Sequence, residues 1–488
     1  MKIDLSGKVL PNYVGGTWVE SSAGKRLDVV NPATGEKLAA VALSSKQEMD
    51  QAITIAAKAF QSWRNTPPVV RARYFFKLKE LLEQDFENLS TILTMENGKT
   101  LAESRGSVRR GIENVEAACG IPTLMQGHVL EDIASGIDCQ AVRQPMGVFG
   151  CITPFNFPAM VPLWFFPTAV ACGNTFVVKP SEQTPLSQKR IFELVDEAGF
   201  PPGVLNLVDG DGEAARALID NPNIIGVSFV GSSAVAESIY KQASNNGKRV
   251  QALGGAKNFV VVMPDCNLES TVSALIDSIY GCAGERCLAA SNILTVGDIH
   301  DKFKEKLMLA AKSLKIGNGL DESVKLGPVI SQKHKDRVVS YIEKGVQEGA
   351  ELVLDGRSVK VPDCPNGFFV GPTIFDKVKP TMTIAREEIF GPVASLINVK
   401  DLDEALLIIH QNEYGNATSI FTSSGKAVRQ FTHDVGISMI GVNIGVAAPM
   451  AFFMFGGTRK SFFGDLKAYG RDGIEFYTDK RVIISRWF

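Results

Sequence analysis

This chain of 488 residues lacks closely spaced residues that could bind a metal or form disulfides. It has only five histidines, and its eight cysteines include no Cys-x-x-Cys pair. A structural zinc site or a secreted disulfide framework needs such spacing, so the sequence predicts no metal centre and favours a reducing compartment. An excess of charge is lacking too. The 51 Lys and Arg residues balance 53 Asp and Glu residues, and the formal charge of −2 gives no global field to recruit nucleic acid or an anionic membrane. Small-molecule chemistry best fits these absences.

Targeting and membrane signals are also missing. The first residues, MKIDLSGKVLPNYVGG, carry charge early and contain neither a signal-type apolar core nor an Arg/Ser-rich presequence. The uncharged span 144–178 favours a buried strand–loop–helix passage over a membrane helix, because proline disrupts helices. Its prolines are Pro145, Pro154, Pro158, Pro162 and Pro167. We therefore expect a cytoplasmic protein that binds neither membrane nor nucleic acid.

Strand-like and helix-like segments alternate from Met146 onward. Apolar runs in GVFGCITPFNFP, NTFVVKPSE, PGVLNLVDG and IIGVSFVGSS each precede a stretch long enough for a helix. Such continuous apolar strands predict parallel βαβ units whose sheet is covered on both faces. After Lys257 the alternation restarts with NFVVVMPD, which predicts a second α/β domain.

Two segments fit neither domain. Residues 128–144 and the tail 473–488 both read as strands with alternating side chains, and a subunit interface would cover their edges. We therefore expect a homo-oligomer, either a dimer or a tetramer.

Two motifs lie where open parallel sheets bind ligands. In SFVGSS, 228–233, a strand ends in glycine before a helix whose N-terminal N–H groups could face a pyrophosphate. In VVKPSE, Lys179 and Glu182 lie just past another strand. Taken alone, plain packing explains the first motif more readily, and a solvated charged turn explains the second.

Cys287 and Asn156 are the candidate reactive residues. Most single cysteines are small buried hydrophobes, but Arg286 next to Cys287 favours the nucleophilic thiolate. Asn156 lies in the proline-stiffened loop PFNFP, where its amide must find a partner. An oxyanion and a backbone hydrogen bond are equally plausible partners.

Taken in order, six motifs resemble those of the aldehyde dehydrogenase superfamily over nearly the whole chain. They are PFNFP (154–158), KPSE (179–182), FVGSS (229–233), LGG (253–255), GERC (284–287) and EEIFGPV (387–393). The resemblance implies an α/β fold with a Rossmann-like NAD domain, a catalytic α/β domain and a small β oligomerisation element. The implied boundaries are 1–124 with 145–255 for the NAD domain, 256–455 for the catalytic domain, and 125–144 with 471–488 for the oligomerisation element.

The resemblance also implies residue roles. Cys287 would attack an aldehyde, Asn156 and the Cys287 backbone N–H would hold the oxyanion, and hydride would pass to the cofactor. Glu182 beside the ribose 2′-hydroxyl would repel a 2′-phosphate, so NAD is favoured over NADP. The expected cofactor contacts are Thr153, Phe155, Lys179, Glu182, Gln183, Ser232, Gly254, Glu388 and Phe390.

One residue of the hydrolytic pattern is missing. In hydrolytic members the turn reads Glu-Leu-Gly-Gly, and its glutamate activates the water that releases the acid. Here the equivalent place is Ala252 in QALGGAKN, while Glu285 points from a helix end and Glu388 looks committed to ribose. A thiolate attacks a thioester with less help than water needs, so coenzyme A is the expected acyl acceptor.

These features narrow the resemblance to CoA-acylating methylmalonate-semialdehyde dehydrogenases, to which GAKN and the segment 464–483 are similar. The resemblance implies that Arg110 and Arg286 clamp the carboxylate of a semialdehyde acid, although a solvated helix face remains the alternative for the RR pair 109–110. The predicted reaction converts malonate or methylmalonate semialdehyde, NAD and coenzyme A to acetyl-CoA or propionyl-CoA with loss of CO2, through a thioester on Cys287. Two alternatives remain. One is a hydrolytic aldehyde dehydrogenase with an unusual base, and the other is a non-catalytic structural relative.

Overall fold

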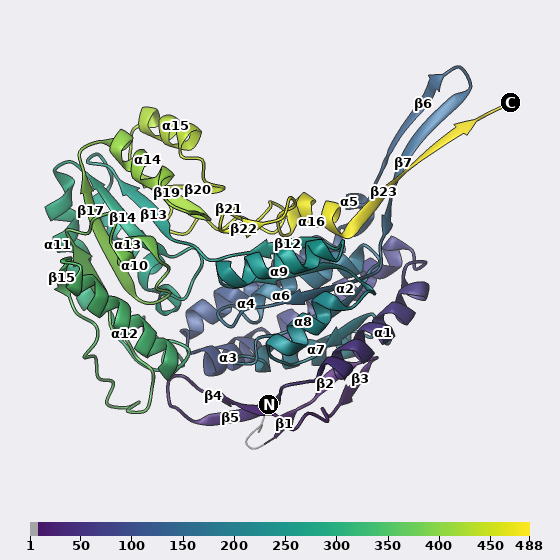
Figure 1. Cartoon of the computed structure of the whole chain (residues 1–488), viewed down its shortest axis with the longest axis horizontal. Helices are drawn as coiled ribbons and strands as arrows, with labels where there is room; N and C mark the ends of the chain where they lie inside the picture. Colours follow the sequence, from purple (N-terminus) through teal and green to yellow (C-terminus); the bar gives the residue numbers. More distant parts are fainter. Residues whose placement is uncertain (1–7) are drawn as a thin grey trace.

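The computed structural model describes residues 8–488, and Figure 1 shows two α/β lobes side by side with a slender arm projecting from one of them. The fold is α/β, as predicted. Residues 1–7, on which part of the targeting prediction depends, lie outside the described residues. Between residues 8 and 488, no helix has the length and apolar character needed to cross a membrane.

The larger sheet belongs to the lobe that carries the arm. Its central strands run parallel, and the outer strands add antiparallel edges. The apolar runs that predicted βαβ units form the central strands, several of which are buried along their whole length. In spatial order the strands are β22 (Phe462–Phe463), β12 (Arg249–Leu253), β11 (Ile224–Val230), β8 (Val148–Ile152), β9 (Thr175–Lys179), β10 (Leu205–Leu207), β2 (Asn12–Val14) and β3 (Thr17–Val19).

Helices cover this sheet on both faces (Figure 1). The uncharged span 144–178 is confirmed as a buried strand–loop–helix passage, because it forms β8, a buried helix and β9. Capping boxes at Ser45 and Thr100 begin two of the N-terminal helices. The helices are α1 (Lys46–Trp63), α2 (Pro68–Gln84), α3 (Phe86–Asn97), α4 (Leu101–Cys119), α5 (Ile121–Leu124), α6 (Met160–Ala171), α7 (Leu186–Glu197), α8 (Gly212–Asp220) and α9 (Ser233–Asn245).

The second lobe restarts the α/β alternation at Asn258, as predicted. Its sheet contains β15 (Glu351–Leu354), β16 (Thr373–Asp376), β17 (Val393–Val399), β14 (Ala290–Val296), β13 (Asn258–Val262), β19 (Ala417–Phe421) and β20 (Met439–Val442), in that spatial order. All neighbours are parallel except β15 and β16. Its helices are α10 (Leu268–Tyr280), α11 (Ile299–Lys312), α12 (Gln332–Gln347), α13 (Thr383–Arg386), α14 (Leu402–His410) and α15 (Gly425–Asp434).

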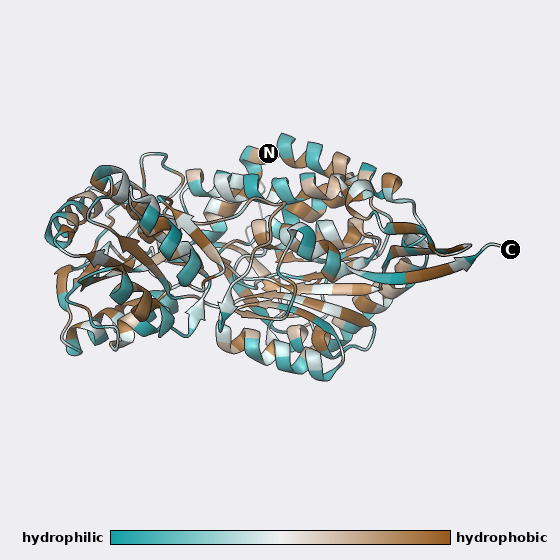
Figure 2. Ribbon diagram, turned by 90° about the horizontal axis from the view of Figure 1, so that it is seen from above, coloured by the Kyte–Doolittle hydropathy of each residue, from teal (hydrophilic) through white to brown (hydrophobic). Residues whose placement is uncertain are grey.

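The arm is a three-stranded antiparallel sheet of β6 (His128–Ala134), β7 (Ile137–Pro145) and β23 (Thr478–Arg486). It projects from the lobe (Figures 1 and 2). Its exposed apolar side chains include Val129 and Ile484. The prediction of strand from residue 473 onward is wrong for its first five residues, which belong to α16 (Gly470–Tyr477). Ile474 and Tyr477, three residues apart, are buried on one face of that helix, and this burial overrides the strand-like pattern. The smaller sheets contain β1 (Val9–Leu10), β5 (Lys37–Ala42) and β4 (Arg26–Val30), and β18 (Tyr414–Gly415) with β21 (Thr458–Arg459).

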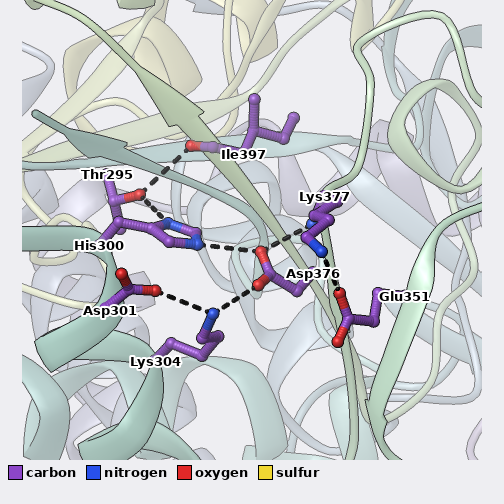
Figure 3. A network of polar contacts seen from close by, with 8 residues as sticks. All are labelled: Thr295, His300, Asp301, Lys304, Glu351, Asp376, Lys377 and Ile397. Atoms are coloured by element: carbon purple, nitrogen blue, oxygen red, sulfur yellow. Dashed lines mark hydrogen bonds and ion pairs between the residues drawn. The ribbon is translucent and has the colours of Figure 1, made fainter.

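A buried polar network ties three elements of the second lobe together (Figure 3). Asp376, at the end of β16, accepts hydrogen bonds from His300 Nε2 at 3.0 Å, Lys304 Nζ at 2.7 Å and the Lys377 backbone N–H at 2.6 Å. His300 Nδ1 lies 2.7 Å from the Thr295 hydroxyl on β14. Burial alone would raise the pKa of Asp376, but the hydrogen bonds from Lys304 and Lys377 and the charges of His300 and Lys304 hold it below its usual range.

Replacing Asp376 with asparagine should destabilise the protein by about 2–4 kcal/mol, because the buried carboxylate that joins Lys304 and His300 is lost. At roughly 2–4 °C for each kcal/mol, the melting temperature should fall by several degrees. Since folding lowers the Asp376 pKa, this contribution is present at neutral pH and is lost as the pH falls through the lowered pKa. The melting temperatures of Asp376→Asn and wild type should therefore converge at acid pH. The control Asp301→Asn removes the exposed partner of the same lysine, and an equal loss at neutral pH would contradict the network's role.

Candidate active site

Cys287 lines a cavity of about 500 Å³ between α4, the start of α6 and the segment 446–455. Arg110 and Arg286 line the same cavity. Arg109, Glu103 and Glu113 line it too, so three guanidinium groups face two carboxylates. A thiol beside this excess of positive charge, on mainly apolar walls, suits a small aldehyde that carries a negative charge. The apolar walls include Phe157, Met160, Trp164, Leu288, Val446 and Phe455.

A strained turn precedes Cys287. The 3-10 turn η1 (Gly281–Gly284) follows α10, and its Cys282 and Ala283 both have a φ of 53°. Left-handed backbone costs a non-glycine residue roughly 1–2 kcal/mol, so contacts from elsewhere must hold the turn. A Cβ on Gly281 would overlap the Arg286 guanidinium, so only glycine allows that close approach.

The Cys287 thiol is protonated in its resting environment. Burial raises its pKa to about 12, the Glu388 charge adds to this effect, and Arg286 opposes it. The Cys287 carbonyl accepts hydrogen bonds from Asn258 Nδ2 and Asn416 Nδ2, each at 2.9 Å. Sequence reasoning missed both asparagines. The available signal was a polar residue at the start of each of two apolar strands that pair with each other.

The two arginines differ in how they are held. Arg286 Nη2 lies 3.7 Å from Cys282 Sγ, while its Nε is buried and has no hydrogen-bond partner among residues 8–488. Arg110 contacts Glu113 at 3.0 Å and the Ala448 carbonyl at 3.1 Å. The structure thus brings both predicted guanidinium groups to the Cys287 cavity, and one of them has a free donor.

Asn156 is engaged with backbone in this structure. Its Nδ2 donates to the Glu285 backbone carbonyl at 2.9 Å, and the backbone carbonyl of Asn156 accepts from the buried Lys99 Nζ at 2.5 Å. The sequence left an oxyanion and a backbone group as alternative partners of the Asn156 amide, and in the structure the amide bonds to the backbone. Asn156 does not line the Cys287 cavity, although the next residue, Phe157, does.

Strand β12 places Leu253, and not Ala252, on the side of Cys287. Alternate residues of a strand face opposite sides of the sheet. Leu253 belongs to the apolar cluster that packs against Cys287, whereas Ala252 is fully buried in a different cluster with Phe463. The identification of Ala252 as the place of the missing base is therefore corrected to Leu253, which is equally unable to activate water.

The remaining acidic candidates face other partners. Glu388 Oε1 accepts from the Ala256 N–H at 2.9 Å, and burial raises its pKa to about 7. Glu285 Oε1 accepts from the Ile330 N–H at 3.0 Å and lies 3.4 Å from His334 Nε2. Burial raises the pKa of Glu285 to about 8. Glu285 does not line the Cys287 cavity.

Helix α12 holds the Glu388–Phe390 segment by its carbonyls. Arg337 donates to the carbonyls of Glu388 at 3.0 Å and Ile389 at 3.3 Å, and His334 Nε2 lies 2.7 Å from that of Phe390. Phe390 needs this support because its φ of 62° is left-handed. Sequence reasoning missed His334 and Arg337, whose partners are backbone atoms that no motif reveals.

The carboxyl ends of β8, β9 and β11 offer groups that fit a dinucleotide. Thr153 Oγ1 is buried without a partner among the described residues, and Lys179 lies 3.1 Å from Glu182 Oε2. Ser232 is the N-cap of α9 but makes no capping bond, so the free N–H groups of this helix can receive a phosphate. The Phe155 ring lies 5.9 Å from that of Phe390.

Two predicted cofactor residues have other surroundings. The Gln183 N–H donates to Ser181 Oγ at 3.3 Å within a turn. The Gly254 N–H donates to the Ser461 carbonyl at 2.9 Å, and a Cβ there would lie 2.7 Å from the Lys460 carbonyl. Gly254 is thus required by a close backbone approach. Within residues 8–488, no three potential metal ligands lie together.

Comparisons with known proteins agree with one another. Residues 18–483 match the model of the aldehyde dehydrogenase family. The chain is 53% identical over 481 residues to malonate-semialdehyde dehydrogenase 2 of Geobacillus kaustophilus strain HTA426, covering 98% of this chain and 99% of that protein. The crystal structure of methylmalonate-semialdehyde dehydrogenase from Oceanimonas doudoroffii is similar with a TM-score of 0.97 at 46% identity, covering 98% of each chain. A Sinorhizobium meliloti 1021 protein provisionally named methylmalonate-semialdehyde dehydrogenase, solved in complex with NAD, gives a TM-score of 0.97 at 42% identity over 98% of each chain.

Proposed function

This chain belongs to the aldehyde dehydrogenase family, and we propose that it oxidises malonate or methylmalonate semialdehyde with NAD and coenzyme A. The products would be acetyl-CoA or propionyl-CoA, CO2 and NADH. The observation that carries this proposal is that Arg110 and Arg286 line one cavity with Cys287. A carboxylate matches a guanidinium group best, so these arginines suit a substrate that carries one. The names of the similar proteins support the same substrate class.

The residues of the chain account for the oxidation. When bound, NAD accepts the hydride from the aldehyde carbon. Cys287 would attack the carbonyl carbon once its thiol proton has left, while Arg110 and Arg286 hold the substrate carboxylate. The Cys287 backbone N–H would receive the oxyanion, joined by Asn156 after it releases the Glu285 carbonyl. An acyl thioester would then remain on Cys287.

Coenzyme A would release the acyl group because Leu253 leaves water without a base. The CoA thiolate would attack the thioester carbonyl and expel the Cys287 thiolate. The carboxylate lies β to that carbonyl, so CO2 can leave with its bonding electrons passing into the thioester oxygen. The carbon then takes a proton, which gives acetyl-CoA or propionyl-CoA.

The cofactor and domain roles follow from the same assignment. Lys179, Glu182 and Gln183 would bind near the adenosine ribose and Ser232 the pyrophosphate. Thr153, Phe155, Gly254, Glu388 and Phe390 would shape the path to the nicotinamide. The NAD-binding role goes to 1–124 and 145–255, the catalytic role to 256–455, and oligomerisation as a dimer or tetramer to 125–144 and 471–488.

The exposed apolar side chains of the arm support a homo-oligomer. The eight free cysteines support a reducing compartment such as the cytoplasm.

A hydrolytic aldehyde dehydrogenase remains the second candidate. It is favoured by Glu388, a carboxyl whose pKa of about 7 would suit a general base. The bond from the Ala256 N–H and the expected ribose role of Glu388 argue against it.

Arg110 provides the test of substrate class. Replacing Arg110 with leucine should raise the KM for malonate semialdehyde by about 30–150-fold, because a charge-assisted contact worth about 2–3 kcal/mol is lost. Propanal has no carboxylate, so its KM should change little. Steady-state NADH formation with both aldehydes measures the difference. Arg105→Leu is the matched control, since Arg105 also lies on α4 but pairs with Glu87 of α3 outside the cavity. An equal loss for both aldehydes would mean that Arg110 supports the fold and not the carboxylate.

A further inference from the structure

We propose that Glu103 is a positioning residue that makes the cavity select anionic aldehydes, although Glu103 is itself an acid in the cavity wall. This proposal rests on the proposed function, and it concerns how the chain holds Arg286. Glu103 would act through the strained turn η1, which carries Arg286 to the cavity.

One carboxylate joins two distant parts of the chain. Glu103 Oε1 accepts from the Cys282 N–H at 2.6 Å, and Glu103 Oε2 accepts from the Thr100 N–H at 2.8 Å. The second bond is half of the capping box that begins α4, so the carboxylate is fixed by its own helix. The first bond reaches Cys282, the first left-handed residue of η1, across 179 residues of sequence.

The position of Arg286 depends on that turn. Its Nη2 lies 3.7 Å from Cys282 Sγ and packs against Gly281, where no side chain could fit. Among residues 8–488 the guanidinium makes no other hydrogen bond, and its Nε is unpartnered. The turn therefore sets the position of Arg286. The hydrogen bond to Glu103 is the contact from outside the turn that holds it in its left-handed form. Relaxation of Cys282 would move the sulfur and with it the guanidinium.

Two effects of Glu103 on an anionic substrate have opposite signs. As a negative charge in the cavity wall, Glu103 repels the substrate, so its removal should improve binding of an anion. As the anchor of η1, it holds Arg286 in place, so its removal should weaken binding of an anion. Neutral aldehydes feel neither effect strongly. The sign of the change therefore separates positioning from a simple wall charge.

The first experiment compares kcat/KM for malonate semialdehyde and propanal in wild type and Glu103→Gln. Glutamine has one acceptor oxygen and cannot serve both the Cys282 and Thr100 N–H groups. We expect the acid-to-propanal ratio to fall about tenfold, as for a displaced charge-assisted contact. A ratio that stays unchanged or rises overturns the proposal. A wild type without preference for the acid would instead refute the proposed function.

A second measurement does not depend on the natural substrate. Cys287 is alkylated with anionic iodoacetate and with neutral iodoacetamide, and the ratio of inactivation rates reports the cation beside the thiol. Glu103→Gln should lower the iodoacetate-to-iodoacetamide ratio if Arg286 is displaced, whereas loss of a wall charge alone should raise it and would overturn the proposal.

Two control variants separate positioning from stability. Thr100→Ala removes the other half of the capping box but leaves the Glu103–Cys282 bond, so both ratios should stay near wild type even if the melting temperature falls. Glu116→Gln makes the same chemical change at a surface position of α4 and should leave both ratios unaltered. If Glu103→Gln does not fold, Cys282→Ala removes the sulfur that holds Arg286, and both ratios should again fall. Wild-type ratios in Cys282→Ala would then overturn the proposal.

Discussion

Replacement of Cys287 by alanine should abolish NADH formation from every aldehyde, with a loss of at least about 10⁴-fold. The reason is that hydride can leave only after the sulfur has added to the carbonyl carbon. The fold should persist, because the backbone carbonyl of residue 287, which alanine retains, accepts hydrogen bonds from Asn258 of β13 and from Asn416 just before β19. NADH absorbance at saturating NAD and calorimetric titration of NAD measure the two properties separately.

Cys282→Ala is the matched control for this loss. Cys282 lines the same cavity and is also buried, but its sulfur faces Arg286. It should retain turnover of propanal and lose only preference for the acid. If Cys282→Ala eliminated propanal turnover while Cys287→Ala did not, the nucleophile would be misassigned.

The layer structure was predictable because its signals are local. Apolar runs such as TFVVK form strands buried on both faces, and the restart at Asn258 marks the second sheet. The error at Gly473–Tyr477 has a tertiary cause. Tyr477 donates or accepts a 2.8 Å hydrogen bond with Ser228 of β11, and the helix that places it there follows from packing rather than from local alternation.

The site was predictable where its residues lie in contiguous motifs and not elsewhere. Cys287, Arg286 and Arg110 reach one cavity, as their motifs implied. His334 and Arg337 act on backbone carbonyls far away in sequence, and such contacts leave no pattern. Ala252 was misplaced for a simpler reason. The Leu-Gly-Gly motif was aligned without considering that successive side chains of a strand point to opposite faces of the sheet. That alternation decides which residue of β12 lies on the Cys287 side.

Omission of coenzyme A should convert steady turnover into a burst of about one NADH for each active site, followed by a slow phase. The thioester forms on Cys287 but persists, because Leu253 cannot activate water and Glu388 is engaged by the Ala256 N–H. Stopped-flow absorbance measures the burst, and mass spectrometry should find the acylated chain. Addition of coenzyme A should restore turnover and release acetyl-CoA from malonate semialdehyde.

Introducing a carboxylate should raise the rate of the slow phase only when the new side chain lies on the face of β12 that packs toward Cys287. A well-placed general base is worth about 10²–10⁴-fold, so Leu253→Glu should accelerate CoA-independent NADH formation up to that range and yield free acid. Ala252→Glu is the matched control, because the same side chain would enter a closed apolar cluster beside Phe463 and should destabilise the fold without activating water. Acceleration by Ala252→Glu alone would show that the face was assigned wrongly. Full-rate, linear NADH formation by wild type without coenzyme A, with free acid as the product, would overturn the acylating mechanism and establish the hydrolytic one.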